Sequence, residues 1–242
     1  MITETHIHSC AKCHSQNIVR NGRNRYGKQQ YLCKDCGTCR VLHPTPHAHT
    51  PERQEEVLRL YQERSSMRGV ARATGVARNT LASWIKKKAA LAPSIAETLL
   101  PAHADDVLEL DEVWSFVYRR SNKRWLWTAL CRRTRQIVAA VVGDRSAETC
   151  QKLWSLIPQT YRQCHTFSDF WAAYENIFDE ETHRSVGKET GETAHMERWN
   201  NTLRQRNARY VRETLSFSKC AIWHQIVTEM FIVAYNLSCI KK

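Results

Sequence analysis

The stretch "LELDEVW" (residues 108–114) decides the fold, because it places a carboxylate inside an apolar run that is typical of a buried strand. Burying the carboxylate of Asp111 is costly unless it is paired, protonated or bound to a cation. Either the run lies at a solvated sheet edge, or Asp111 has a chemical role that its partners must reveal.

The pattern around this stretch predicts strands. "VLELDEVWSFVY", "RWLWTALCRR" and "QIVAAVVGD" are β-rich runs separated by short basic turns, which favours an antiparallel meander. "SAETCQKLWSLIP" predicts a helix with Ser146 as its N-cap and Pro158 after its end. "CHTFSD" predicts a short strand that ends at Asp169, and "HRSVGK" is a candidate for another.

Two helices are expected to finish the chain, at about 193–209 and 216–237. A three-strand meander, a helix, a strand and further helices follow one another in the order of an RNase H-like α/β domain. We therefore predict such a domain at 104–242.

Charge is distributed unevenly along the 242 residues. The formal net charge is +12; residues 1–100 carry 16 Lys and Arg against 7 Asp and Glu, and residues 101–242 carry 20 against 17. A strongly basic front half indicates an anionic polymer as partner, most often nucleic acid. A basic surface kept for solubility is the alternative.

No stretch indicates membrane insertion or export. The start "MITETHIHSC" is polar, and no run approaches the ~20 apolar residues that span a bilayer. We expect a cytoplasmic protein, in whose reducing surroundings the ten cysteines favour metal binding over disulfides.

The cysteines of the front segment form two pairs, Cys10-x2-Cys13 and Cys33-x2-Cys36, on either side of a glycine-bearing hairpin. This arrangement predicts four thiolates around a structural Zn²⁺ in a zinc-binding domain at 1–45. Cys39 continues the spacing and is an alternative ligand. Reduced cysteines buried as small hydrophobes would not explain the repeated spacing. The Pro/His-rich "HPTPHAHTP" (43–51) then predicts a linker.

Residues 52–90 predict a helix-turn-helix DNA-binding domain. A helix at 52–63 is followed by "MRGVARATGVARNTLASWIKKK" (67–88), with Gly75 at the turn and a second helix from Arg78. The second helix offers base-edge donors and acceptors near its start and phosphate-binding cations at its end. The expected DNA-binding residues are Arg78, Asn79, Thr80, Ser83 and Lys86.

Two further acids are candidate partners of Asp111. Asp169 ends a predicted strand, and Glu197 lies on a predicted helix beside an apolar stripe, in one row with Asn200 and Arg204. Three converging carboxylates can bind two Mg²⁺ ions, or Mn²⁺, for phosphodiester chemistry. The competing acids in this half are Glu109, Glu112 and Asp144.

The whole chain resembles the insertion-sequence-1 family of bacterial DDE transposases. The resemblance rests on "LELDEVW" with the following "RWLW", on "SDFWAAYE", and above all on "ERWNNTLRQRNARY" with the later "TLSFSK". It implies that Asp111, Asp169 and Glu197 are the catalytic acids and that Arg204 is the basic residue that follows them. The family often has a histidine near the glutamate; His195 would point away from Glu197 around the helix, so we leave it out of the site.

The resemblance also implies an activity. Such an enzyme would bind the terminal inverted repeats of its own element, cleave to free 3′ hydroxyls and join these to target DNA. Its partners would be double-stranded DNA and, because two ends are joined in one event, a second subunit in a homodimer or larger synaptic complex. It would act on the nucleoid. The rivals are a DNA-binding regulator without catalysis and a plain RNase H-like nuclease.

Overall fold

The computed structural model of the chain describes residues 2, 7–44, 49–211, 213 and 215–240. The chain forms two compact units, Met1–Thr50 and Pro51–Lys242. The predicted linker at 43–51 falls partly outside the described residues, which omit 45–48.

The first unit is a small antiparallel sheet. Its strands are β1 (Ile18–Arg23), β2 (Gln29–Cys33) and β3 (Cys39–Arg40), in the order β1-β2-β3. Gly27, at a φ of 76°, turns the chain between β1 and β2, as the hairpin prediction requires. Cys10 and Cys33 are the only buried hydrophobic side chains among its described residues. So small a core needs another source of stability.

The second unit is built on a mixed five-stranded sheet. The strands are β4 (Val107–Phe116), β5 (Lys123–Cys131), β6 (Ile137–Gly143), β7 (His165–Ser168) and β8 (His183–Ser185). The order is β6-β5-β4-β7-β8, with the first three antiparallel and β7 and β8 parallel to β4. The predicted meander is therefore present, β4 is the central strand, and the fold is RNase H-like.

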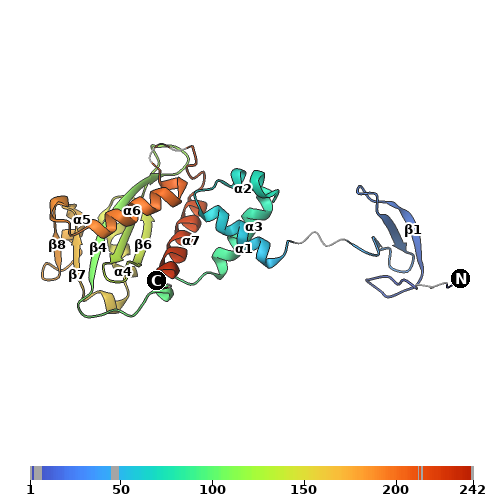
Figure 1. Cartoon of the computed structure of the whole chain (residues 1–242), viewed down its shortest axis with the longest axis horizontal. Helices are drawn as coiled ribbons and strands as arrows, with labels where there is room; N and C mark the ends of the chain where they lie inside the picture. Colours follow the sequence, from blue (N-terminus) through green and yellow to red (C-terminus); the bar gives the residue numbers. More distant parts are fainter. Residues whose placement is uncertain (1, 3–6, 45–48, 212, 214, 241–242) are drawn as a thin grey trace. The chain divides into compact units, whose positions relative to one another are not determined.

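Helices cover both faces of this sheet (Figure 1). α4 (Ala147–Leu156) and α5 (Ala172–Glu175) pack with one face, and the Ser146 hydroxyl caps α4 as predicted. α6 (Ala194–Arg206) and α7 (Ala221–Ile240) pack with the other. Short 3-10 turns complete the unit: η1 (Ala96–Thr98), η2 (Gln159–Tyr161), η3 (Lys188–Thr190) and η4 (Ala208–Tyr210).

The last two helices differ from their predicted bounds. α6 stops at Arg206, because the Asn207 side chain accepts the Arg209 amide hydrogen and starts η4 instead. α7 starts five residues later than expected, because the Ser218 carbonyl accepts the Tyr118 amide hydrogen at 2.7 Å, beside the end of β4. Within the described residues, no helix has both the length and the apolar composition needed to cross a bilayer.

The predicted helix-turn-helix is present as α1 (Pro51–Gln62), α2 (Met67–Thr74) and α3 (Arg78–Leu91). Gly75 ends α2 in the left-handed conformation, at a φ of 73°. The buried side chains of α1–α3 form one apolar cluster that also contains Met230 of α7. α7 thus lies between the sheet and the three helices (Figure 1), and joins them in one unit.

A buried histidine on α7 links three segments of this unit. His224 is 1% exposed, and its ring nitrogens lie 3.1 Å from the hydroxyl of Ser115 on β4 and 2.8 Å from that of Ser218. Burial, followed by the nearby arginine charges, lowers the pKa of His224 to about 4. The neutral ring is the form that this site holds.

We predict that acid destabilises the second unit through His224. Below the ordinary histidine pKa of 6.5, His224 binds a proton in the unfolded chain but stays neutral in the folded chain until the pH approaches 4. The free energy of unfolding therefore falls as the pH drops from 6.5 toward 4. At pH 4.5 the loss is about 2–3 kcal/mol. Urea unfolding at pH 7 and 4.5, followed by tryptophan fluorescence, measures it, because all eight Trp lie in the second unit.

His224→Gln should remove this part of the pH dependence, and His103→Gln, at an exposed position, should keep it. Equal slopes for wild type and His224→Gln would contradict the assignment.

Candidate active site

Parallel pairing of β4 with β7 brings two of the predicted acids together. Val107 lies opposite His165 and Glu109 opposite Phe167. Asp111 and Asp169 lie two residues further along these two segments, and are therefore side by side at the carboxyl end of β7. The alternation of a strand puts Asp111 on the same face as Glu109, which is the face that α6 covers.

The predicted acids and the predicted basic residue line one pocket of about 320 Å³. α6 contributes Glu197, Asn200 and Arg204, which a helix places on one face at this spacing. The Asn200 side-chain amide donates a hydrogen bond of 2.5 Å to the Asp111 carboxylate. The structure therefore gathers Asp111, Asp169, Glu197 and Arg204, three carboxylates and a guanidinium, around one small cavity.

A fourth carboxylate approaches the first two. Oxygen atoms of Asp111, Glu112 and Asp169 lie within 4.8 Å of one another, a group that does not include Glu197. Glu112 accepts hydrogen bonds from Arg145 at 2.9 Å and Tyr174 at 3.1 Å. Burial, and then repulsion by Asp169, raise the pKa of Glu112 to about 7. The sequence names Glu112 only as a competing acid, and the structure brings its carboxylate close to those of Asp111 and Asp169.

Glu109 ties α6 to the sheet. Its carboxylate is fully buried and accepts hydrogen bonds from Arg132 Nε at 2.9 Å and from the Met196 backbone amide at 2.8 Å. It also lies 2.6 Å from His195 Nδ1. Burial raises the pKa of Glu109, against the effect of these hydrogen bonds. An acid that precedes Asp111 by two residues thus holds the helical turn that carries Glu197, and His195 lies in this contact rather than in the pocket.

Asp144, a further competitor, lies elsewhere. It accepts hydrogen bonds from Ser146 at 2.5 Å and Thr149 at 2.6 Å at the start of α4, and these bonds lower its pKa. A carboxylate in this position stabilises the first turn of a helix.

The four predicted cysteines of the first unit converge. One sulfur atom each from Cys10, Cys13, Cys33 and Cys36 lies within 4.8 Å of the others, with 3.6 Å between Cys10 and Cys36 and 3.5 Å between Cys13 and Cys33. Cys39 is outside this group and accepts a hydrogen bond from Asn21. Four sulfurs without a disulfide suit a tetrahedral metal ion.

α3 presents its predicted DNA-binding residues on two sides. Arg78 and Asn79 line a groove shared with α7, and Lys86 lies 5.7 Å from the Trp223 ring of α7. At 100° per residue, Ser83 lies 40° beyond Asn79, at the edge of this side, and Thr80 lies 100° beyond Asn79, so only Thr80 faces away from that groove. Only part of the predicted set therefore shares one face.

Comparison with known proteins matches two regions of the chain to families. Residues 106–237 match the family described as IS1 transposase, and residues 5–37 match the family described as InsA N-terminal domain, a zinc ribbon. Insertion element iso-IS1n protein InsB of Shigella dysenteriae is 36% identical over 128 residues, which are 52% of this chain and 93% of that protein. Insertion element IS1 protein InsB of Shigella flexneri is 37% identical over 119 residues, 49% of this chain and 88% of that protein.

An RNase H-like sheet with carboxylates at its centre, in one chain with a zinc ribbon, is typical of DDE transposases, and the family match places the chain in this class. This chain belongs to the IS1 transposase family.

The hydrogen bonds of Glu109 to Arg132 and to the Met196 amide should stabilise the second unit. Glu109→Gln should lower the free energy of unfolding by about 2 kcal/mol, because it removes the charge that Arg132 and the Met196 amide face. Hydrogen exchange of the Met196 amide should become faster. Glu192→Gln is the matched control, since it removes only the exposed partner of Arg132. Equal exchange rates at Met196 in both variants would show that Glu109 does not hold α6.

Proposed function

We propose that this transposase binds the terminal inverted repeats of its own insertion sequence, cleaves their 3′ ends and joins them to target DNA. The observation that carries the proposal is the single pocket shared by Asp111, Asp169, Glu197 and Arg204. Carboxylates beside a guanidinium suit a phosphodiester, which needs cations on its oxygens while a bond to phosphorus breaks.

The acids would hold the divalent ions. Carboxylate oxygens are the ligands that Mg²⁺ and Mn²⁺ prefer, and Asp111 and Asp169 are close enough to share one ion. Bound there, such ions would activate the attacking oxygen and stabilise the leaving 3′ oxygen. Asn200 fixes the orientation of the Asp111 carboxylate. Arg204 would bind the non-bridging oxygens of the phosphate.

The other two parts of the chain would select the DNA. Residues 1–45 would fold around Zn²⁺ held by Cys10, Cys13, Cys33 and Cys36, residues 52–90 would bind the duplex, and 104–242 would perform the chemistry. The sequence predicts that Arg78, Asn79, Thr80 and Ser83 read base edges and that Lys86 contacts phosphate. Since Arg78 and Asn79 line the groove beside α7, we propose that Thr80 and Ser83 reach base edges, while Arg78, Asn79 and Lys86 contact the phosphate backbone. A homodimer or larger synaptic complex on the nucleoid would hold two ends together.

Conservative substitutions of the acids test the catalytic proposal. Asp111→Asn, Asp169→Asn and Glu197→Gln should each abolish cleavage and joining of labelled element ends to a target plasmid with Mg²⁺. Binding of the ends should remain, because each change keeps the shape of the side chain and removes only a metal-binding charge. Asp144→Asn should stay active, since Asp144 lies at the start of α4.

Glu112→Gln decides which glutamate completes the set. If it abolishes joining while Glu197→Gln does not, Glu112 is the third acid. Bound but intact DNA with the wild-type protein would instead favour a regulator, and cleavage without joining would favour a plain nuclease.

Metal analysis tests the zinc site. One Zn²⁺ per chain should co-purify, and Cys13→Ser or Cys33→Ser should lose it and unfold the first unit, whose small core cannot replace the metal. Cys39→Ser is the control that should retain zinc. Purified protein with iron, or loss of zinc from Cys39→Ser and not from Cys36→Ser, would overturn the ligand assignment.

A further inference from the structure

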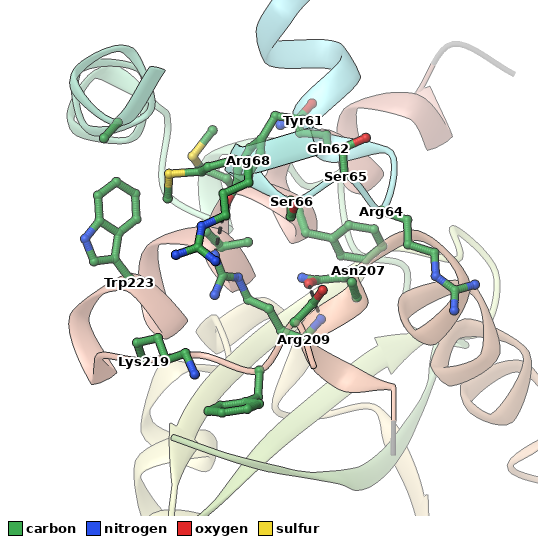
Figure 2. Close-up of a pocket in the computed structure, with 18 of the residues that line it drawn as sticks. Tyr61, Gln62, Arg64, Ser65, Ser66, Arg68, Asn207, Arg209, Lys219 and Trp223 are labelled. Carbon is green, nitrogen blue, oxygen red and sulfur yellow. Dashed lines mark hydrogen bonds between the residues drawn. The ribbon is translucent and has the colours of Figure 1, made fainter. Parts of the chain in front are cut away.

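A groove of about 490 Å³ lies between the helix-turn-helix and the catalytic half (Figure 2). It is lined by the α1–α2 turn, the first turn of α3, the chain from the end of α6 through η4, and the side of α7. Of its lining residues six are basic and none is acidic: Arg64, Arg68, Arg78, Arg206, Arg209 and Lys219. We call this site the cationic groove.

The positive charge of the cationic groove is largely uncompensated. Among the described residues, only Arg206 of the six has a carboxylate partner, Glu63. Arg209 donates to two neutral oxygens, the Tyr61 hydroxyl at 2.9 Å and the Ser218 hydroxyl at 3.2 Å. Arg68 from α2 and Arg209 from η4 extend toward one another (Figure 2). Like charges held together in this way favour a bound anion.

Two further features of the cationic groove independently favour an anion. Asn207 is 6% exposed, and its side-chain amide nitrogen is buried without a hydrogen-bond partner among the described residues. A buried donor of this kind is rare and costly unless a ligand accepts from it. α3 also begins at this groove without a side-chain cap, so its first backbone N–H groups add to the positive potential.

Continuity with the active site identifies the anion. α6 carries Glu197 and Arg204 in the acid pocket and Arg206 at its last turn in the cationic groove. The ten residues from Glu197 to Asn207 span ~15 Å, which is the length of about four nucleotides of a DNA strand. A strand whose scissile phosphate lies among the acids therefore reaches this groove within a few nucleotides.

We propose that the cationic groove binds a backbone phosphate of the element end, within about five nucleotides of the scissile phosphate. The inference rests on the proposed function, because it takes the acid pocket as the place of the scissile bond. The groove then fixes the distance between the base pairs that α3 reads and the bond that is cut, without reading sequence itself.

Methylphosphonate interference tests this proposal on the full chain. A series of terminal-repeat duplexes, each with one phosphate made neutral, is titrated by fluorescence anisotropy without added divalent ions. The wild-type protein should lose about five- to tenfold in affinity at one or two positions in the expected window, since each lost phosphate contact removes one charge pair. Arg68→Ala should weaken binding to the unmodified duplex by a similar factor and make those positions insensitive.

Asn207→Asp provides a second, independent variant. The aspartate keeps the oxygen that accepts the Arg209 amide hydrogen and adds a negative charge to the groove, so it should reproduce the behaviour of Arg68→Ala. Lys152→Ala, which removes one exposed charge from α4 on the other face of the sheet, should bind and respond like wild type. Tryptophan fluorescence verifies folding of every variant.

The outcomes separate the two proposals. Suppose that wild type joins ends to target, and that the same methylphosphonate positions weaken binding of wild type, Arg68→Ala and Asn207→Asp. The groove assignment is then wrong, and the proposed function stands. If the variants weaken terminal repeat and random duplex equally, with no positional effect, the groove supplies only general attraction and the assignment is also overturned. If wild type joins no ends at all, the proposed function itself fails.

Discussion

Strand β4 is buried at the centre of the sheet and yet carries three carboxylates within four residues, Glu109, Asp111 and Glu112. Each needs a compensating partner, and the partners come from several elements. Glu109 accepts hydrogen bonds from Arg132 and from the first turn of α6. Asp111 accepts one from Asn200, further along α6. Glu112 accepts hydrogen bonds from Arg145 and Tyr174. Satisfying these acids therefore fixes where α6 and the loops around α4 and α5 lie, and with them the geometry of the pocket.

The shared helix α7 imposes a second constraint. One of its sides packs in the apolar cluster of α6 and the sheet, and another contributes Met230 to the cluster of α1–α3. His224 of the same helix contacts Ser115 on β4. A helix-turn-helix held in this way cannot move without exposing apolar surface, so α3 keeps a set distance from the acids.

α6 connects the two charged regions of the second unit. Its first half faces the carboxylates of β4 and β7, and its last turn leads into the cationic groove. Carboxylates attract metal ions, and the guanidinium groups of the cationic groove attract phosphates. The two ends of α6 therefore adjoin regions of opposite charge, which together suit a nucleic-acid backbone and its bound metal ions. Both proposals for the site follow from this separation of charge along a single rigid element.

The sequence by itself determined the elements and the chemistry that local patterns encode. The alternation of residue types predicted the strands of the meander, and Gly75 predicted the turn of the helix-turn-helix. The spacing within each pair of cysteines predicted their common site. Each of these patterns can be recognised from residues that are close together in the chain. Only the tertiary structure decided which acids meet. Glu112 lies close to Asp169, and Glu109 holds α6. Both contacts join segments that are far apart in the chain, so no local sequence pattern predicts them. For the same reason the cationic groove, assembled from α2, α3, η4 and α7, has no sequence signature, since its residues become neighbours only when the two halves pack together.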